Sequence, residues 1–93
     1  MKSKLKTMPW DENIWKALLR AAAYIPPTVR VEALIAVIKE SEREAIRRGS
    51  EIVEERDLVI AAHRKVPAAY KEVSLQILRE QGINVDKYLS GKV

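Results

Sequence analysis

Tyr24–Gly49, with the sequence YIPPTVRVEALIAVIKESEREAIRRG, determines the fold expected for this chain. Pro26 and Pro27 end any preceding helix, because the residue before a proline avoids the α region and proline has no amide hydrogen to donate. They also suit the first turn of a following helix, and Gly49 suits a left-handed cap after a basic last turn. These signals predict one long central helix from about Thr28 to Arg48.

The expected buried side of this long helix is a wide apolar stripe. Its residues are Val31, Leu34, Ile35, Ile38, Ala45 and Ile46. A stripe of this width can serve both the core of the chain and a partner, so it predicts self-association as a homodimer.

Shorter helices are predicted on both sides of the central one. Asp11 is placed to cap a first helix that runs to about Tyr24, with a stripe formed by Ile14, Trp15, Leu18, Leu19 and Ala22. An extended link over residues 50–53 leads to a third helix that begins near Glu54 and Glu55 and is closed by Pro67.

A fourth helix is predicted from about Ala68 to Gln81. Its stripe is Tyr70, Val73, Ile77 and Leu78, and Gly82 ends it. Asn84 is placed to cap a last short turn that holds Val85, Tyr88 and Leu89.

The fold class predicted from these elements is all-α, with four main helices around a long central helix in an orthogonal or histone-like packing. A short four-helix bundle is the alternative. We expect residues 1–8, with Lys2, Lys4 and Lys6, to form a flexible basic N-terminal arm, and residues 9–93 to form a single helical domain. The core residues expected to be mostly buried are Trp15, Leu18, Leu34, Ile38, Leu58 and Ile77.

Composition excludes several kinds of site. The 93 residues contain no cysteine, so disulfides, thiolate metal sites and iron–sulfur clusters are impossible. We expect no cofactor, no metal site, no membrane span and no secretory signal, and the cytoplasm is the expected compartment. The formal charge of +4 suits an acidic partner but is modest for a dedicated nucleic-acid binder.

No group in the sequence predicts catalysis. His63 is the only histidine, and no acid, serine or second histidine stands at a spacing that would orient it. The acidic groups Glu40, Glu42, Glu44 and Glu51, Glu54, Glu55, Asp57 are interpreted as solvated helix faces, whereas acid catalysis needs a carboxyl in an environment that shifts its pKa. Among the aromatic residues, Trp15 and Tyr70 are expected to fill the core.

Two candidate binding regions stand out. The double-proline turn combines a flat aromatic surface with a guanidinium, and its residues are Tyr24, Ile25, Pro26, Val29 and Arg30. A second set of basic residues is a candidate for anion or nucleic-acid contacts, together with the basic arm: Arg47, Arg48, Arg64 and Lys65. Surface salt bridges, such as Glu44 with Arg48, explain these charges equally well.

One family resembles this chain over about residues 10–64. Its pattern is Trp10-Asp11, then Ile25-Pro26-x-x-Val29-Arg30, then Glu42-x-x-Ala45-x-x-x-Gly49, followed by Val53, Leu58 and Ala61. This pattern resembles the small helical C-terminal domain of the light-independent protochlorophyllide reductase B subunit, although residues 30–49 span about one helical turn more than expected. The resemblance implies a non-catalytic accessory or protein-interaction domain that docks on a larger protein of a nitrogenase-like complex acting on tetrapyrroles.

A second resemblance points to another class of function. The long helix, the Gly49-x-x-x-Val53 link and a next helix opened by acidic residues are similar to the second half of an archaeal-type histone fold. That resemblance implies a DNA-binding dimer as the alternative function. Two features count against it: the first helix is joined through a double proline, and the thirteen acidic residues leave only a modest positive surplus for phosphates.

Overall fold

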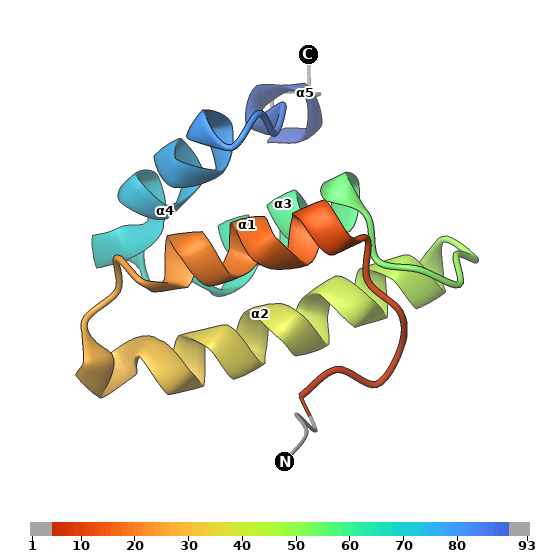
Figure 1. The fold of residues 1–93 in the computed structure, drawn as a ribbon, viewed down its shortest axis with the longest axis horizontal. Coiled ribbons are helices and arrows are strands. Elements are labelled where there is room, and N and C mark those ends of the chain that lie inside the picture. Colours follow the sequence, from red (N-terminus) through yellow and green to blue (C-terminus); the bar gives the residue numbers. More distant parts are fainter. Residues whose placement is uncertain (1–4, 90–93) are drawn as a thin grey trace.

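The computed structural model describes residues 5–89, and these residues form five helices joined by short turns (Figure 1). The helices are α1 (Glu12–Ala22), α2 (Pro27–Arg47), α3 (Glu55–Lys65), α4 (Ala68–Glu80) and α5 (Val85–Leu89). Within this part of the chain no strand occurs beyond one isolated bridge. The all-α prediction is therefore confirmed, and the predicted helix ends lie within two residues of the observed ones.

The predicted caps are present. One Asp11 carboxylate oxygen accepts hydrogen bonds from the backbone amides of Asn13 and Ile14, at 2.9 and 3.2 Å. Gly49 has a φ of +78°, the left-handed conformation that glycine adopts without steric cost. The Asn84 side chain accepts a hydrogen bond from the Lys87 amide at 3.2 Å and so caps α5. Local sequence signals thus set where each of these elements begins or ends.

Helix α2 is the longest element and packs mainly against α3, while α1 packs mainly against α4. In Figure 1, α1 runs alongside α2 in the opposite direction. The segment before α1 therefore meets the link after α2, and Trp10 and Val53 form a parallel bridge there. The Asp11 amide donates to the Val53 carbonyl, and the Val53 amide donates to the Pro9 carbonyl, both at 3.0 Å. These hydrogen bonds join the start of α1 to the end of α2.

The core contains four of the six side chains expected there: Leu18, Ile38, Leu58 and Ile77 are all buried. Trp15 and Leu34 are less completely buried and pack against the core, as Tyr70 does.

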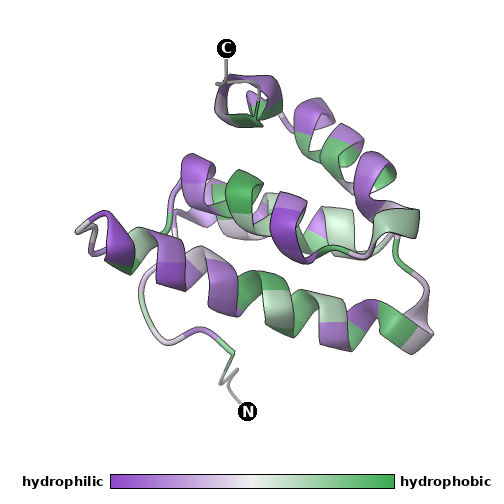
Figure 2. Ribbon diagram, turned by 180° about the vertical axis from the view of Figure 1, so that it is seen from behind, coloured by the Kyte–Doolittle hydropathy of each residue, from purple (hydrophilic) through white to green (hydrophobic). Residues whose placement is uncertain are grey.

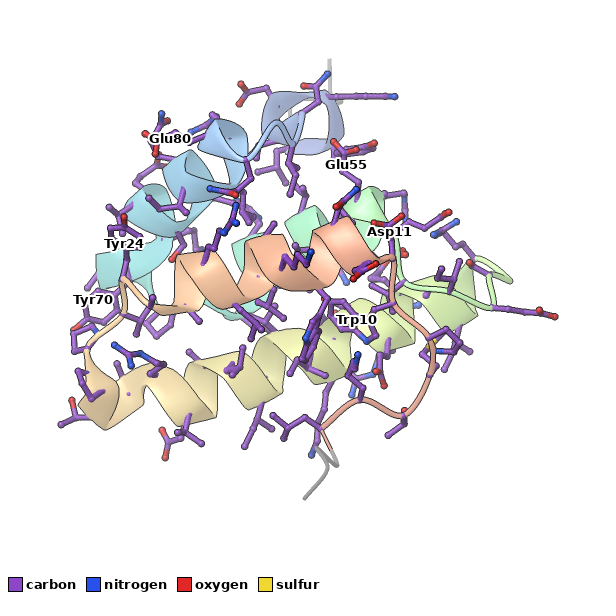
Figure 3. All side chains as sticks on the ribbon, viewed as in Figure 1. Trp10, Asp11, Tyr24, Glu55, Tyr70 and Glu80 are labelled. Atoms are coloured by element: carbon purple, nitrogen blue, oxygen red, sulfur yellow. The ribbon has the colours of Figure 1, made fainter. Side chains whose placement is uncertain are left out.

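Trp10 is the buried tryptophan instead, and its side chain lies between the N-terminal segment and α2 (Figure 3). The reason is a polar contact: its indole nitrogen donates to the Glu42 carboxylate on α2 at 2.8 Å. The Trp15 ring packs edge-on against Trp10, with centroids 5.1 Å apart, and the Lys6 ammonium lies 4.4 Å above the Trp15 ring.

The buried side of α2 differs from the predicted one. Val31 and Ile46 are 62% and 65% exposed, so their assignment to the core was wrong. Ile38 and Ala45 of the predicted stripe are buried, and the rest of the buried side carries smaller or polar residues, among them Ala33, Val37 and Ser41. Leu19 on α1 and Val73 on α4 were also expected on buried stripes and are 43% and 46% exposed. Relative to the predicted orientation, α2 is rotated about its axis, because acidic residues occupy much of its covered surface.

Residues 1–4 of the predicted basic arm, with Lys2 and Lys4, lie outside the described residues. Residues 5–8 lie against α2, where Thr7 donates hydrogen bonds from its amide and hydroxyl to Glu42. Across residues 5–89, no helix is both long and apolar enough to cross a membrane.

Candidate interaction face on helix α2

Four carboxylates that the sequence assigned to solvated faces are buried. Glu40, Glu42 and Glu44 of α2 are 3–5% exposed, and Asp57 of α3 is 0% exposed. That interpretation was wrong, because each carboxylate is matched by donors from elsewhere in the chain, which offset the cost of removing it from water. Figure 2 shows that hydrophilic residues gather in the C-terminal half of α2, where these glutamates lie.

Glu40 and Glu44 lie one turn apart and share a cluster of guanidinium groups with α3. Arg64 bridges them, with its Nη1 atom 2.7 Å from Glu40 and 2.6 Å from Glu44. The hydrogen bond from Arg64 lowers the pKa of Glu40 and in turn raises the pKa of Arg64. The arginines that contact the two carboxylates are Arg43, Arg47, Arg56 and Arg64. Arg56 also lies 3.7 Å from Asp57 of α3, so the cluster continues to Arg48 and Glu54. Among the described residues, five guanidinium groups and four carboxylates in this connected cluster leave a surplus of one positive charge.

Asp57 ties the end of α2 to the start of α3. Arg48 binds it with two hydrogen bonds, from Nε at 2.8 Å and from Nη2 at 2.7 Å, and this contact raises the pKa of Arg48. The Glu54 amide also donates to Asp57, at 2.9 Å, and completes a capping box for α3. The expected pair of Glu44 with Arg48 was wrong, because the Arg48 side chain extends toward α3 and Glu44 pairs with Arg47 instead.

Three of the four predicted anion contacts are thus already bound to carboxylates: Arg47, Arg48 and Arg64. Lys65 differs, since it lines a shallow groove along α2. Nucleic-acid binding by this set stays a prediction, and only the part of each guanidinium that faces solvent is available for it.

The predicted binding turn also has an internal role. Arg30 donates from Nε to the Ile25 carbonyl at 3.0 Å and from Nη2 to the Ala23 carbonyl at 3.3 Å, so it caps the end of α1. Ile25 is buried, and Val29 is partly buried and packs against the core. Tyr24, at the end of α1 in Figure 3, is 61% exposed and is the part of this turn most open to a partner.

The side of α2 that no helix covers has a distinct surface, which we call the outer face. It consists of Val31, Glu32, Ile35, Lys39, Arg43 and Ile46. Two shallow grooves flank a ridge formed by Ile35, Lys39 and Arg43. The first groove, of about 400 Å³, is closed on its far side by Leu5 and Thr7, and the second, of about 360 Å³, is closed by Lys65. The sequence analysis placed Val31, Ile35 and Ile46 on a stripe wide enough to serve both the core and a partner. It did not indicate which part of that stripe stays outside the core, which in the structure includes Val31 and Ile46.

Another groove, of about 540 Å³, lies between the start of α1 and the α4–α5 turn. Its charged groups have partners: Arg48 binds Asp57, and Glu55 accepts a hydrogen bond from the Asn84 amide at 2.6 Å. Over residues 5–89, no group of three acidic or imidazole side chains is placed to hold a metal ion. His63 is exposed on α3.

Comparison with protein-family models, with curated protein sequences and with solved structures finds no match to this chain. The residues that carry the resemblance to the reductase domain nevertheless have clear places in the fold. Trp10 binds Glu42, Arg30 caps α1, Gly49 ends α2 and Val53 forms the bridge. These residues therefore have structural roles in this fold, and they do not by themselves indicate a function.

Proposed function

We propose that this chain is a non-catalytic accessory domain that docks on a larger protein through the outer face of α2. The observation that supports the proposal most is the exposure of Val31 and Ile46, 62% and 65%, on the helix that forms the centre of the fold. Fully burying an exposed side chain of this size is worth about 1.5–3 kcal/mol. Val31 and Ile46 are already about one third covered, so a partner that covers both gains most of that free energy from each.

The outer face replaces the double-proline turn as the proposed contact. Arg30 donates two hydrogen bonds to backbone carbonyls at the end of α1, which favours a structural role for the double-proline turn. The outer face has exposed apolar side chains, two grooves and unburied cations within one surface, which are the components of a protein-binding site.

A larger protein fits this face better than a second copy of the chain does. Along the grooves each copy exposes Lys39, Arg43 and Lys65 but only one acidic residue, Glu32. Two copies placed face to face would bring these cations together with only Glu32 of each copy beside them on the surface, because Glu40, the carboxylate that Arg43 contacts, is buried. The excess of like charge at the surface opposes pairing. The homodimer and the histone-like DNA-binding dimer remain alternatives that the experiment below can separate.

The resemblance to the protochlorophyllide reductase appendage suggests what kind of assembly to look for, namely a reductase complex to which this domain is attached. The proposal does not depend on it, since the residues that carry the resemblance hold the fold together. The genes that neighbour this one in its own genome are an independent check on the reductase assignment.

The test is a comparison of two matched variants in the organism that makes the protein. Ile46→Asp places a charge on the outer face, and Val73→Asp places one on α4, where the native side chain is 46% exposed. After circular dichroism shows both to be folded, each tagged chain is purified under mild conditions and its assembly size measured. We expect Ile46→Asp alone to release a larger partner. Equal assemblies from both variants and the wild type would refute the proposed face.

A further inference from the structure

We infer that the segment which occupies the outer face is an acidic amphipathic helix of the partner protein. This inference rests on the proposed function and specifies the chemistry of the partner. Two independent features of the face support it, the shape of its apolar part and the sign of its charge.

The apolar part has the shape that a second helix requires. Ile35 lies on a ridge with a groove on each side, and helices pack by placing the ridge of one into the groove of the other. Val31 and Ile46 are fifteen residues apart, which corresponds to about 22 Å of helix at 1.5 Å per residue. A partner helix of about four turns, with one apolar stripe, spans that length.

The polar part is strongly biased toward positive charge. Lys39, Arg43 and Arg47 recur every fourth residue and form a cationic edge along α2. Lys65 of α3 lines one groove together with Lys39 and Arg43. Arg43 and Arg47 each contact a buried glutamate that is shared with α3, so their charge is only partly balanced. Both guanidinium side chains are also more than half exposed, at 55% and 56%. Carboxylates on the partner helix can therefore bind them from the solvent side.

Nucleic acid fits this surface less well than an acidic helix does. Backbone phosphates are bound by cationic and hydrogen-bonding groups, which leaves the exposed Val31 and Ile46 and the partly buried Ile35 without a contact. An acidic amphipathic helix contacts both the apolar and the cationic part of the outer face. Its apolar stripe covers the isoleucines, and the acidic residues beside that stripe bind the cationic edge.

A titration with two labelled peptides tests the inference on the full chain. One peptide is a designed amphipathic helix of about 18 residues with leucines on one stripe and glutamates beside it; its twin has lysines in place of the glutamates. Fluorescence anisotropy reports binding at about 50 mM and 500 mM salt, where screening differs widely. The variants are Lys39→Glu and Ile46→Asp, with Lys71→Glu and Val73→Asp on α4 as matched controls.

We expect only the acidic peptide to bind, with affinity reduced about tenfold or more by Lys39→Glu and by high salt, and unchanged in the α4 controls. Equal binding of both peptides, or indifference to Lys39→Glu, would overturn the inference. In a competition experiment, duplex DNA of similar length and unlabelled acidic peptide are each added to the labelled complex. Displacement of the labelled peptide by the DNA but not by the unlabelled peptide would also overturn the inference, in favour of a nucleic-acid surface. If Ile46→Asp releases a partner in cells while the acidic peptide fails to bind, the docking face stands and only its acidic helical occupant is rejected.

Discussion

Replacing Arg48 with alanine removes the guanidinium that holds Asp57, whose side chain is 0% exposed. Loss of one member of a buried ion pair costs about 3–5 kcal/mol, because the remaining charge stays out of water without its partner. Here the Glu54 amide still donates to Asp57 and Arg56 lies 3.7 Å away, so we expect the lower end, about 3 kcal/mol. For a chain of 93 residues, this is a large share of a total stability of about 5–14 kcal/mol.

Urea unfolding followed by the helical circular dichroism signal measures this loss. The matched control is Arg43→Ala, since Arg43 is 55% exposed and its partner Glu40 keeps Arg64, so its cost should stay below about 1 kcal/mol. A double-mutant cycle with Asp57→Asn isolates the coupling between the two side chains. If the free energy of unfolding of Arg48→Ala lies within about 0.5 kcal/mol of the wild-type value, Arg48 does not hold α2 to α3 and is available as an anion contact.

Four further changes test separate parts of the fold. Ser74→Ala should raise the free energy of unfolding by about 1 kcal/mol, because the buried hydroxyl has no hydrogen-bond partner; a lower urea midpoint would contradict this. Gly49→Ala should cost about 1–2 kcal/mol through its φ of +78° alone, since nothing lies within 4 Å of an added Cβ, and an unchanged midpoint would show that the turn relaxes. Trp10→Phe removes the indole donor to the buried carboxylate on α2 and should cost about 1.5–3 kcal/mol in the same melt, more than Trp15→Phe. The folded pKa of Glu40 is lowered below its ordinary 4.5, so its contribution to stability is complete above that pH and is lost as the pH falls through the folded value. Glu40→Gln should therefore flatten the decline of unfolding free energy below about pH 4.5, and parallel pH profiles would argue against the Arg64 contact.

The sequence allowed the helix ends to be predicted because each end is set by residues close to it. Asp11, Gly49, Pro67 and Asn84 act on backbone groups within a few positions, and local preferences of this kind are readable without knowledge of the fold. The class of fold follows from those ends and from the helical spacing of apolar residues.

The sides of the helices could not be predicted in the same way, because they depend on partners far away in the chain. Glu42 is buried by Trp10, which is 32 positions away, and Glu40 is buried by Arg64, which is 24 positions away. A run of alternating charges in α2 is typical of a solvated surface, and nothing local indicates that α3 supplies its counterions. Once those glutamates are buried, the helix turns Val31 and Ile46 outward, and the candidate site appears where a core was expected.

Site-specific photocrosslinking at position 46 tests the docking face most directly. A photoreactive amino acid replaces Ile46 in one chain and Val73 in a matched chain, and both are irradiated in the cells that make the protein. The crosslinked segment is then sequenced by mass spectrometry. Docking through the outer face predicts a single partner protein attached at position 46 and absent at position 73. Crosslinks at position 46 only to a second copy of the chain, or the same products at both positions, would contradict it.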